Sequence, residues 1–177
     1  MAFRSRKGKN RVKRLTRADF LRSWGMHPYA TTRYSGLKGV YWYYFSRKRR
    51  KEDFMRYGTC ISCDKRVENW EHEDAGHFIA ASRGGFGLLF EPINVHLQHK
   101  KCNNPRFTPD AAVGYAINLD KRYGVGTAAA LWDLRGKEVH EWSKDEYVLK
   151  LAGMGILQNT QKEAPPKRGS YRHREER

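Results

Sequence analysis

The pattern of hydrophobic and polar positions predicts two helices in the first third of the chain. Thr16 is a capping residue for a short helix that runs through Trp24 and ends at Gly25. Residues 28–39 are expected to form a loop. Residues 40–57 are aromatic at both ends and predict a second, longer helix with a strongly basic middle.

Capping signals predict three further helices in the last third. Residues 108–110 supply a capping hydroxyl, a proline for the first turn and an acid that suits the helix dipole. This helix is expected to run to Tyr123 and to stop at the glycine that follows. Residues 128–134 are expected to form another short helix, and residues 143–146 match a capping box that begins a helix through about Ala152.

The segment between these helices, residues 60–104, combines short apolar runs with residues suited to chemistry. The apolar residues after His77 predict a strand, and residues 88–90 and 95–98 indicate the return path. A helix is expected to begin near residues 99–102. The order of strand, loop, strand and helix predicts an α+β fold with a small ββα core surrounded by helices.

The composition adds a large positive charge to this picture. The 177 residues include 35 Lys and Arg against 19 Asp and Glu, which gives a net charge of +16. Each phosphate that a basic side chain neutralises releases counterions and adds affinity, so the excess indicates a nucleic-acid partner. An enzyme for small metabolites does not need this charge. A merely soluble basic protein or a ribosomal-type structural protein remains an alternative.

Two basic segments and one tail are expected to have particular roles. Residues 1–15 contain seven basic residues and no acid, so they predict a disordered arm that clamps phosphates, or else a solubilising tail. Residues 159–177 are expected to be disordered as well. Five consecutive charged residues cannot share one face of the second helix. Some of them are expected to contact DNA; the alternative is that all five lie on a solvated surface. These are Arg47, Lys48, Arg49, Arg50 and Lys51.

The three cysteines predict a metal site. Cys60 and Cys63 have the spacing of a zinc knuckle, in which a tight turn points both sulfurs inward. His99 and Cys102 have the spacing of a second half-site. A Cys₃His shell is closed to water, so this zinc is expected to be structural, and its binding would help to stabilise the domain.

Several alternatives remain open at this site. His96 and His72 are other nearby histidines that could complete the shell. A redox-active cysteine pair would need a thioredoxin-like alternation of strands and helices, and the sequence pattern lacks one. The remaining alternative is that the three cysteines are simply buried. The basic N-terminus lacks the apolar run of a signal peptide, and no stretch has the length of a membrane span. A soluble protein of a reducing, cytoplasmic compartment is expected.

Three motifs in this order resemble the phage NinG (Rap) family of recombination endonucleases. They are CxxC at 60–63, DAGHF at 74–78 and NVHLQHKKCN at 94–103. The chain is similar, more distantly, to T4 endonuclease VII and other HNH nucleases, which have the ββα-metal architecture. The resemblance covers about residues 40–125.

The resemblance implies a role for each matching residue. His77 takes the place of the general base, and Asn94 that of the central asparagine that braces the loop orienting this base. Asn103 takes the place of the residue that binds the catalytic magnesium, for which manganese is an alternative. His99 stands where the NinG pattern has a cysteine, and both residue types bind zinc.

A second departure concerns Gly76, because many HNH enzymes carry a metal-binding aspartate directly before the base. Asp74 is therefore either a second magnesium ligand or a structural brace. An imidazole near its ordinary pKa is partly unprotonated at neutral pH and can act as a general base. A magnesium ion held by an amide oxygen would stabilise the negative charge on the phosphorane and on the leaving oxygen. Arg106 and Lys100 are candidates for added charge at the scissile phosphate.

These inferences predict a metal-dependent DNA endonuclease. The resemblance implies branched DNA, most of all Holliday junctions, as its substrate in the host cytoplasm, and symmetric cutting would favour a homodimer. The alternatives are a zinc-stapled nucleic-acid-binding module without catalysis and an HNH nickase that acts on duplex DNA. The expected regions are a basic arm, a helical DNA-contacting segment, the zinc-bound nuclease core, C-terminal helices and a tail, at 1–15, 16–58, 59–125, 126–158 and 159–177.

Overall fold

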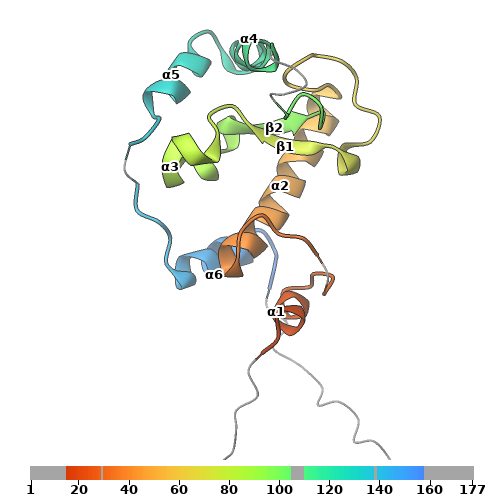
Figure 1. Ribbon diagram of the computed structural model, residues 1–177, viewed down its shortest axis with the longest axis vertical. Helices are drawn as coiled ribbons and strands as arrows, with labels where there is room; N and C mark the ends of the chain where they lie inside the picture. The colour runs from red at the N-terminus through yellow and green to blue at the C-terminus, as the bar shows by residue number, and fades with distance from the viewer. Residues whose placement is uncertain (1–14, 29, 105–109, 138, 158–177) are drawn as a thin grey trace, which may run out of the picture. The chain divides into compact units, whose positions relative to one another are not determined.

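The computed structural model describes residues 15–28, 30–104, 110–137 and 139–157 (Figure 1). The chain divides into two compact units, Thr32–Gly153 and a second formed by Met1–Thr31 with Met154–Arg177. None of the helices in the described ranges combines the length and the apolar character that a bilayer crossing requires. The elements are α1 (Arg17–Ser23), α2 (Gly36–Tyr57), η1 (Trp70–His72), β1 (Asp74–His77), α3 (Ala81–Leu89), η2 (Pro92–Asn94), β2 (Val95–Gln98), α4 (Ala111–Tyr123), α5 (Thr127–Asp133) and α6 (Lys144–Gly153).

The sheet consists of β1 and β2, which pair antiparallel with Asp74 opposite Gln98. Several helices and one small sheet in the described residues confirm the predicted α+β class. Successive side chains of a strand point to opposite faces. Ala75 and His77 therefore share one face of the sheet, while Asp74, Gly76 and Gln98 share the other. The predicted base and the candidate ligand Asp74 leave β1 on opposite faces.

Helix α2 covers the outer edge of β2 with two charged side chains. Arg49 Nε donates to the backbone oxygen of Val95 (3.2 Å). The Asp53 carboxylate accepts from the backbone N–H of Leu97 and from Nδ1 of the His96 ring, both at 2.8 Å. Burial raises the pKa of Asp53, but the hydrogen bond from His96 and the nearby positive charges outweigh it and lower the pKa. The unpaired edge of β2 is thereby satisfied within the chain.

Replacing Asp53 by alanine should lower the free energy of unfolding by about 3–5 kcal/mol, because Arg49 and His96 would lose a buried acceptor. Asp53 is only 2% exposed. The neighbouring Glu52 is the matched control: it pairs with the same arginine at the surface, so Glu52→Ala should change this free energy by less than about 1 kcal/mol. Urea denaturation measures both, and equal effects would contradict the structural role of the buried network.

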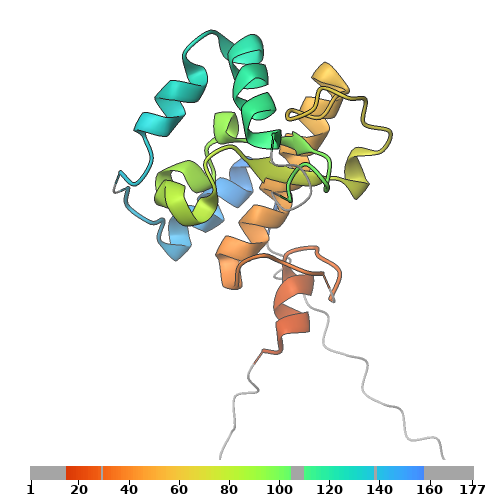
Figure 2. The same ribbon diagram turned by 45° about the horizontal axis from the view of Figure 1, so that its top comes forward.

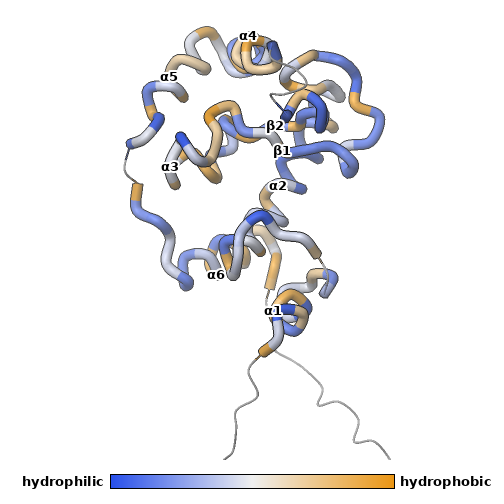
Figure 3. The backbone as a smooth tube through the Cα atoms, viewed as in Figure 1, coloured by the Kyte–Doolittle hydropathy of each residue, from blue (hydrophilic) through white to orange (hydrophobic). Residues whose placement is uncertain are grey.

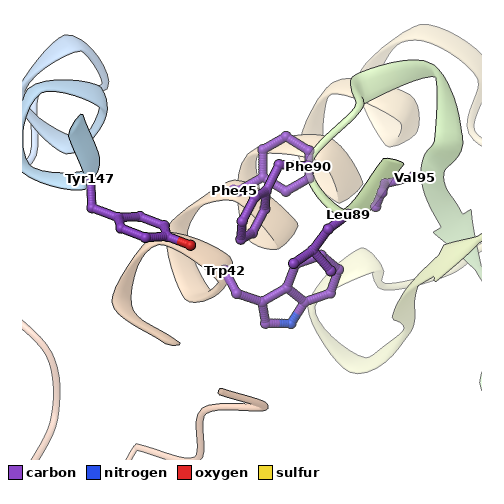
Figure 4. Close-up of a cluster of buried hydrophobic side chains, with 6 residues drawn as sticks. All are labelled: Trp42, Phe45, Leu89, Phe90, Val95 and Tyr147. Atoms are coloured by element: carbon purple, nitrogen blue, oxygen red, sulfur yellow. The ribbon is translucent and has the colours of Figure 1, made fainter. Parts of the chain in front are cut away.

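A cluster of mostly aromatic side chains joins α2, α3, β2 and α6. Figure 4 shows Tyr147 pointing from α6 toward the side chains of α2. Aromatic rings bury large areas, so this cluster explains why the first turns of α2 are aromatic. Figure 3 shows hydrophilic residues concentrated around β1 and the segment that leads into it. The buried members are Trp42, Phe45, Leu89, Phe90, Val95 and Tyr147.

The capping signals were good predictors of helix starts. Thr16 Oγ1 accepts from the backbone N–H of Asp19 (3.1 Å) at the start of α1. At α6 the capping box is complete, since the Ser143 N–H donates to Glu146 (2.7 Å) and the Glu146 N–H donates to Ser143 Oγ (3.3 Å). Helices α5 and α6 lie within a residue or so of their predicted bounds, and α4 ends at Tyr123 as expected. The predicted cap at residues 108–109 lies outside the described residues.

Four expectations about bounds and strands were wrong. Helix α2 begins at Gly36, inside the expected loop. Strand β1 ends at His77 rather than beginning after it, and residues 88–89 lie in helix α3, where both leucines are buried. No helix begins within residues 99–104, because this segment turns to close the metal cluster, and α4 starts at Ala111.

Helix α4 packs beside α5 (Figure 2). Tyr115 of α4 donates to the backbone oxygen of Gly76 (2.9 Å), and this bond attaches α4 to β1.

Candidate metal and catalytic site

The four predicted zinc ligands lie together. The ligand atoms of Cys60, Cys63, His99 and Cys102 all lie within 4.8 Å of one another. The first pair sits in a tight turn after α2, in which the Cys60 carbonyl accepts from the N–H of Asp64 (2.9 Å). The second pair comes from the turn that follows β2. These four residues could hold a structural metal ion such as zinc.

The hydrogen bonds of His99 indicate which ring nitrogen could bind a metal. Its Nε2 faces the backbone oxygen of Arg66 (3.2 Å), which can only accept, so Nε2 carries the proton. Nδ1 keeps its lone pair and lies 3.3 Å from Cys63 Sγ. A carbonyl that holds the second ring nitrogen in this way is a common support for a metal-binding histidine. His96 is instead engaged by Asp53 and a backbone oxygen, so it does not complete the shell.

The thiol groups show why this cluster fits a cation. Burial and the nearby thiols raise the pKa of Cys102 to about 12. Burial also raises the pKa of Cys63, but hydrogen bonds, above all from the Lys65 backbone N–H, outweigh it and lower the pKa to about 7. Three thiolates cannot lie this close without a positive charge between them. A divalent cation would supply that charge, and metal binding would deprotonate all three sulfurs.

His77 makes one hydrogen bond through Nε2, and its Nδ1 has no partner among the described residues. Its Nε2 donates to the backbone oxygen of Leu89 (3.0 Å), and its ring stacks on Trp42 at 5.0 Å between ring centroids and 12° between planes. Burial lowers the pKa of His77 to about 4, and the charge of Arg33 acts in the same direction. The ring is therefore neutral at pH 7 with its lone pair on Nδ1, rather than half-protonated as its ordinary pKa would imply.

Asn94 connects two segments next to His77. It is fully buried, its Oδ1 accepts from the Ile79 N–H (2.8 Å), and its Nδ2 donates to the carbonyls of Ile79 (3.1 Å) and Leu88 (2.8 Å). These bonds tie the end of α3 to the segment directly after His77. The Leu89 carbonyl that holds His77 is thereby kept in place, which supports the predicted bracing role.

A pocket of about 270 Å³ opens beside β1. Asn103 is exposed there, and its Nδ2 donates to the Asp74 carboxylate (3.0 Å). His77 is not among the lining residues, but Trp42 joins it to the pocket, because this ring both stacks on His77 and lines the pocket. The lining comprises Arg33, Trp42, Ser46, Arg50, Glu73, Asp74, Ala75 and Asn103.

The five consecutive basic residues of α2 divide into two kinds. Arg49 binds Val95, Glu52 and Asp53, and Arg50 donates to four backbone oxygens, three of which lie at residues 70–73. Both therefore hold the fold together. Lys48 and Lys51 are exposed, while Arg47 pairs with an acid of η1 at the surface. DNA contact by any of the five stays a prediction.

The other two basic residues predicted to contact DNA are Lys100 and Arg106. Lys100 is exposed, and its backbone N–H donates to Glu73 (2.7 Å) at the edge of the pocket. Arg106 lies outside the described residues. Sequence reasoning missed Arg33 and Trp42, because neither stands in a motif and both reach the pocket only through tertiary packing. It also missed Gln98, whose side chain is buried against Gly76.

Comparison with known proteins identifies the family. The chain matches the family described as NinG, Bacteriophage Lambda NinG protein, over residues 43–163. No curated protein and no solved structure matches it. The match spans the metal cluster, the sheet, the pocket lining except Arg33 and Trp42, and α4 to α6, which is more than half of the chain. The chain therefore belongs to the NinG family of bacteriophage proteins.

Proposed function

We propose that this protein is a metal-dependent DNA endonuclease of the HNH type, with the pocket beside β1 as its cutting site. One observation carries the proposal. A neutral imidazole, with its Nε2 proton donated to a carbonyl, stacks on the tryptophan that lines a pocket holding an exposed amide and a carboxylate. A purely structural histidine gives no reason for its stacking partner to border an open pocket together with this amide and this carboxylate.

In the proposed reaction a water molecule attacks the phosphorus and passes its proton to Nδ1 of His77. The bond from phosphorus to the leaving oxygen breaks, and that oxygen is protonated from solvent. Asn103 and Asp74 would hold a magnesium ion, which supplies positive charge for the phosphorane and the leaving oxygen when bound. Arg33 and Arg50 line the same pocket and would neutralise a phosphate that enters it.

The zinc cluster has a structural part in this proposal. It fixes the turn that carries Asn103, which directly follows the ligand Cys102. The exposed side chains of Lys48, Lys51 and Lys100 would contact DNA phosphates, and the net charge of +16 favours a polyanion. The proposal also includes branched DNA as the substrate, which the resemblance to recombination endonucleases supports, a homodimer that would suit symmetric cutting, and action in the host cytoplasm.

The direct test is a cleavage assay on a four-way junction, a fork, a linear duplex and single-stranded DNA, with magnesium and with EDTA at low salt. We expect magnesium-dependent cutting with the junction as the preferred substrate. Tight binding of every DNA form without cutting would instead support the non-catalytic module. Equal nicking of duplex and junction would support the nickase and contradict the branched substrate.

A further inference from the structure

Gln98 has a buried oxygen with no partner among the described residues. The side chain is only 4% exposed, and its Oε1 accepts no hydrogen bond. Its Nε2 donates to Ser62 Oγ (2.7 Å) and to the backbone oxygen of Cys102 (2.9 Å). The Cys102 carbonyl can only accept, so the amide nitrogen must face it and Oε1 must face away. An unsatisfied buried carbonyl oxygen is unfavourable and needs an explanation.

This oxygen points toward the candidate magnesium ligands. A Cβ atom placed on Gly76 would lie 1.7 Å from Gln98 Oε1 and 3.0 Å from Asn103 Oδ1, so both amide oxygens border the same small space. Gln98 stands opposite Asp74 in the sheet and on the same face. The Asp74 carboxylate accepts from Asn103 Nδ2 (3.0 Å), which leaves Asn103 Oδ1 free for another partner.

Two amide oxygens and one carboxylate thus meet over one face of β1. Oxygen donors of this kind are the ligands of hard divalent cations such as Mg²⁺ and Mn²⁺. The two amide oxygens repel each other across the space unless a cation lies between them. The same arrangement explains Gly76: a side chain there would displace the Gln98 oxygen.

We propose that Gln98 Oε1 is a third protein ligand of the divalent cation held by Asn103 and Asp74. It takes the part that an acid directly before the base would otherwise fill. This inference rests on the proposed nuclease function, because that function supplies the cation. It extends that function by making the sheet, and not only the turn after it, part of the cation site.

The test measures Mn²⁺ binding to the zinc-loaded full chain without DNA, by the electron paramagnetic resonance signal of free Mn²⁺. Gln98→Ala should weaken binding at least about tenfold. The double variant Gly76→Asp with Gln98→Ala should recover most of this affinity, because the new carboxylate enters the vacated space. Both variants lose the bonds to Ser62 and Cys102, so a merely structural role of Gln98 predicts no recovery.

Asn118→Ala is the matched control. Asn118 is also a buried amide, 6% exposed, and it donates to the Ile61 carbonyl (2.8 Å) away from the pocket. Its replacement should leave Mn²⁺ affinity within about twofold of the wild type, since it removes a buried hydrogen bond but no cation ligand. A loss equal to that of Gln98→Ala would overturn the proposal.

A second measurement decides the matter if Gln98→Ala does not fold. In the wild type with ¹⁵N-labelled glutamine and asparagine side chains, Mg²⁺ should shift the Gln98 and Asn103 amide resonances and leave those of Gln158 and Gln161 unchanged. Mg²⁺ shifts confined to Asn103 would overturn the role of Gln98 but keep the cation site. Absence of any Mn²⁺ binding by the wild type would instead contradict the proposed function itself.

Discussion

Replacing His77 by alanine should lower the rate of DNA cleavage by about 10²–10⁴-fold, the usual contribution of a general base. The reason is the state of its ring. Burial lowers the pKa of His77 to about 4, so the ring is neutral at pH 7, and the bond from Nε2 to the Leu89 carbonyl leaves Nδ1 unprotonated. The only other ionisable side chain of β1 is the Asp74 carboxylate, which the proposal assigns to the cation.

Two further variants separate this chemistry from packing. His77→Phe keeps an aromatic ring on Trp42 but has no lone pair, so it should be as inactive as the alanine variant. His72→Ala is the matched control, because His72 is an exposed histidine a few residues earlier, and it should cut like the wild type. Zinc content and circular dichroism should agree among all of them. A His77→Phe enzyme with the wild-type cleavage rate would contradict the mechanism.

The sequence was most informative where chemistry restricts spacing. Two cysteines separated by two residues, followed by His99 and Cys102 at the same spacing, leave few arrangements around one ion. The four ligand atoms do lie within 4.8 Å of one another. Helix caps were also predictable from spacing, since a capping side chain needs its partner three residues ahead. The box at residues 143–146 could therefore be read without any knowledge of the fold.

The sheet was harder to predict because strand signals are short. A strand after His77 was expected, but β1 ends at this residue. Such an error matters, since shifting a strand by one residue moves each side chain to the other face. The leucines of α3 were expected in a strand, because a short apolar run does not distinguish a buried helix from a buried strand.

The tertiary roles of polar residues were not visible in the sequence. Arg49 and Arg50 belong to a basic run that indicates a nucleic-acid surface, yet their side chains hold β2 and the segment before β1. Gln98 shows the opposite case, since an ordinary polar residue is buried beside the pocket. Its place depends on the register of β1 with β2 and on the Cys102 carbonyl, and neither follows from local pattern.

The Cys₃His cluster and the proposed magnesium site are physically connected. The Cys102 carbonyl fixes the amide of Gln98, and the following residue, Asn103, contacts Asp74. A change in the turn at Cys102 would therefore move two oxygens of the cation site together. The structural metal ion would thus act on catalysis through geometry alone, although its closed shell leaves no place for water or substrate.

Loss of zinc should therefore unfold the core and abolish cleavage. Structural zinc sites supply on the order of 10 kcal/mol of apparent binding free energy, which is comparable to the stability of a whole domain. Cys60→Ser should remove bound zinc, broaden or abolish the thermal unfolding transition and eliminate cutting. Lys65→Ala, at an exposed position in the same turn, is the control and should retain zinc and activity.

Metal replacement on the wild type distinguishes the two ions. After a strong chelator has removed all metal, Mg²⁺ alone should not restore cleavage, because the turn carrying Asn103 would no longer be held. Zn²⁺ alone should restore the unfolding transition without cleavage, and only the two together should restore both. Full cleavage with Mg²⁺ in a protein shown by elemental analysis to contain no zinc would contradict this dependence.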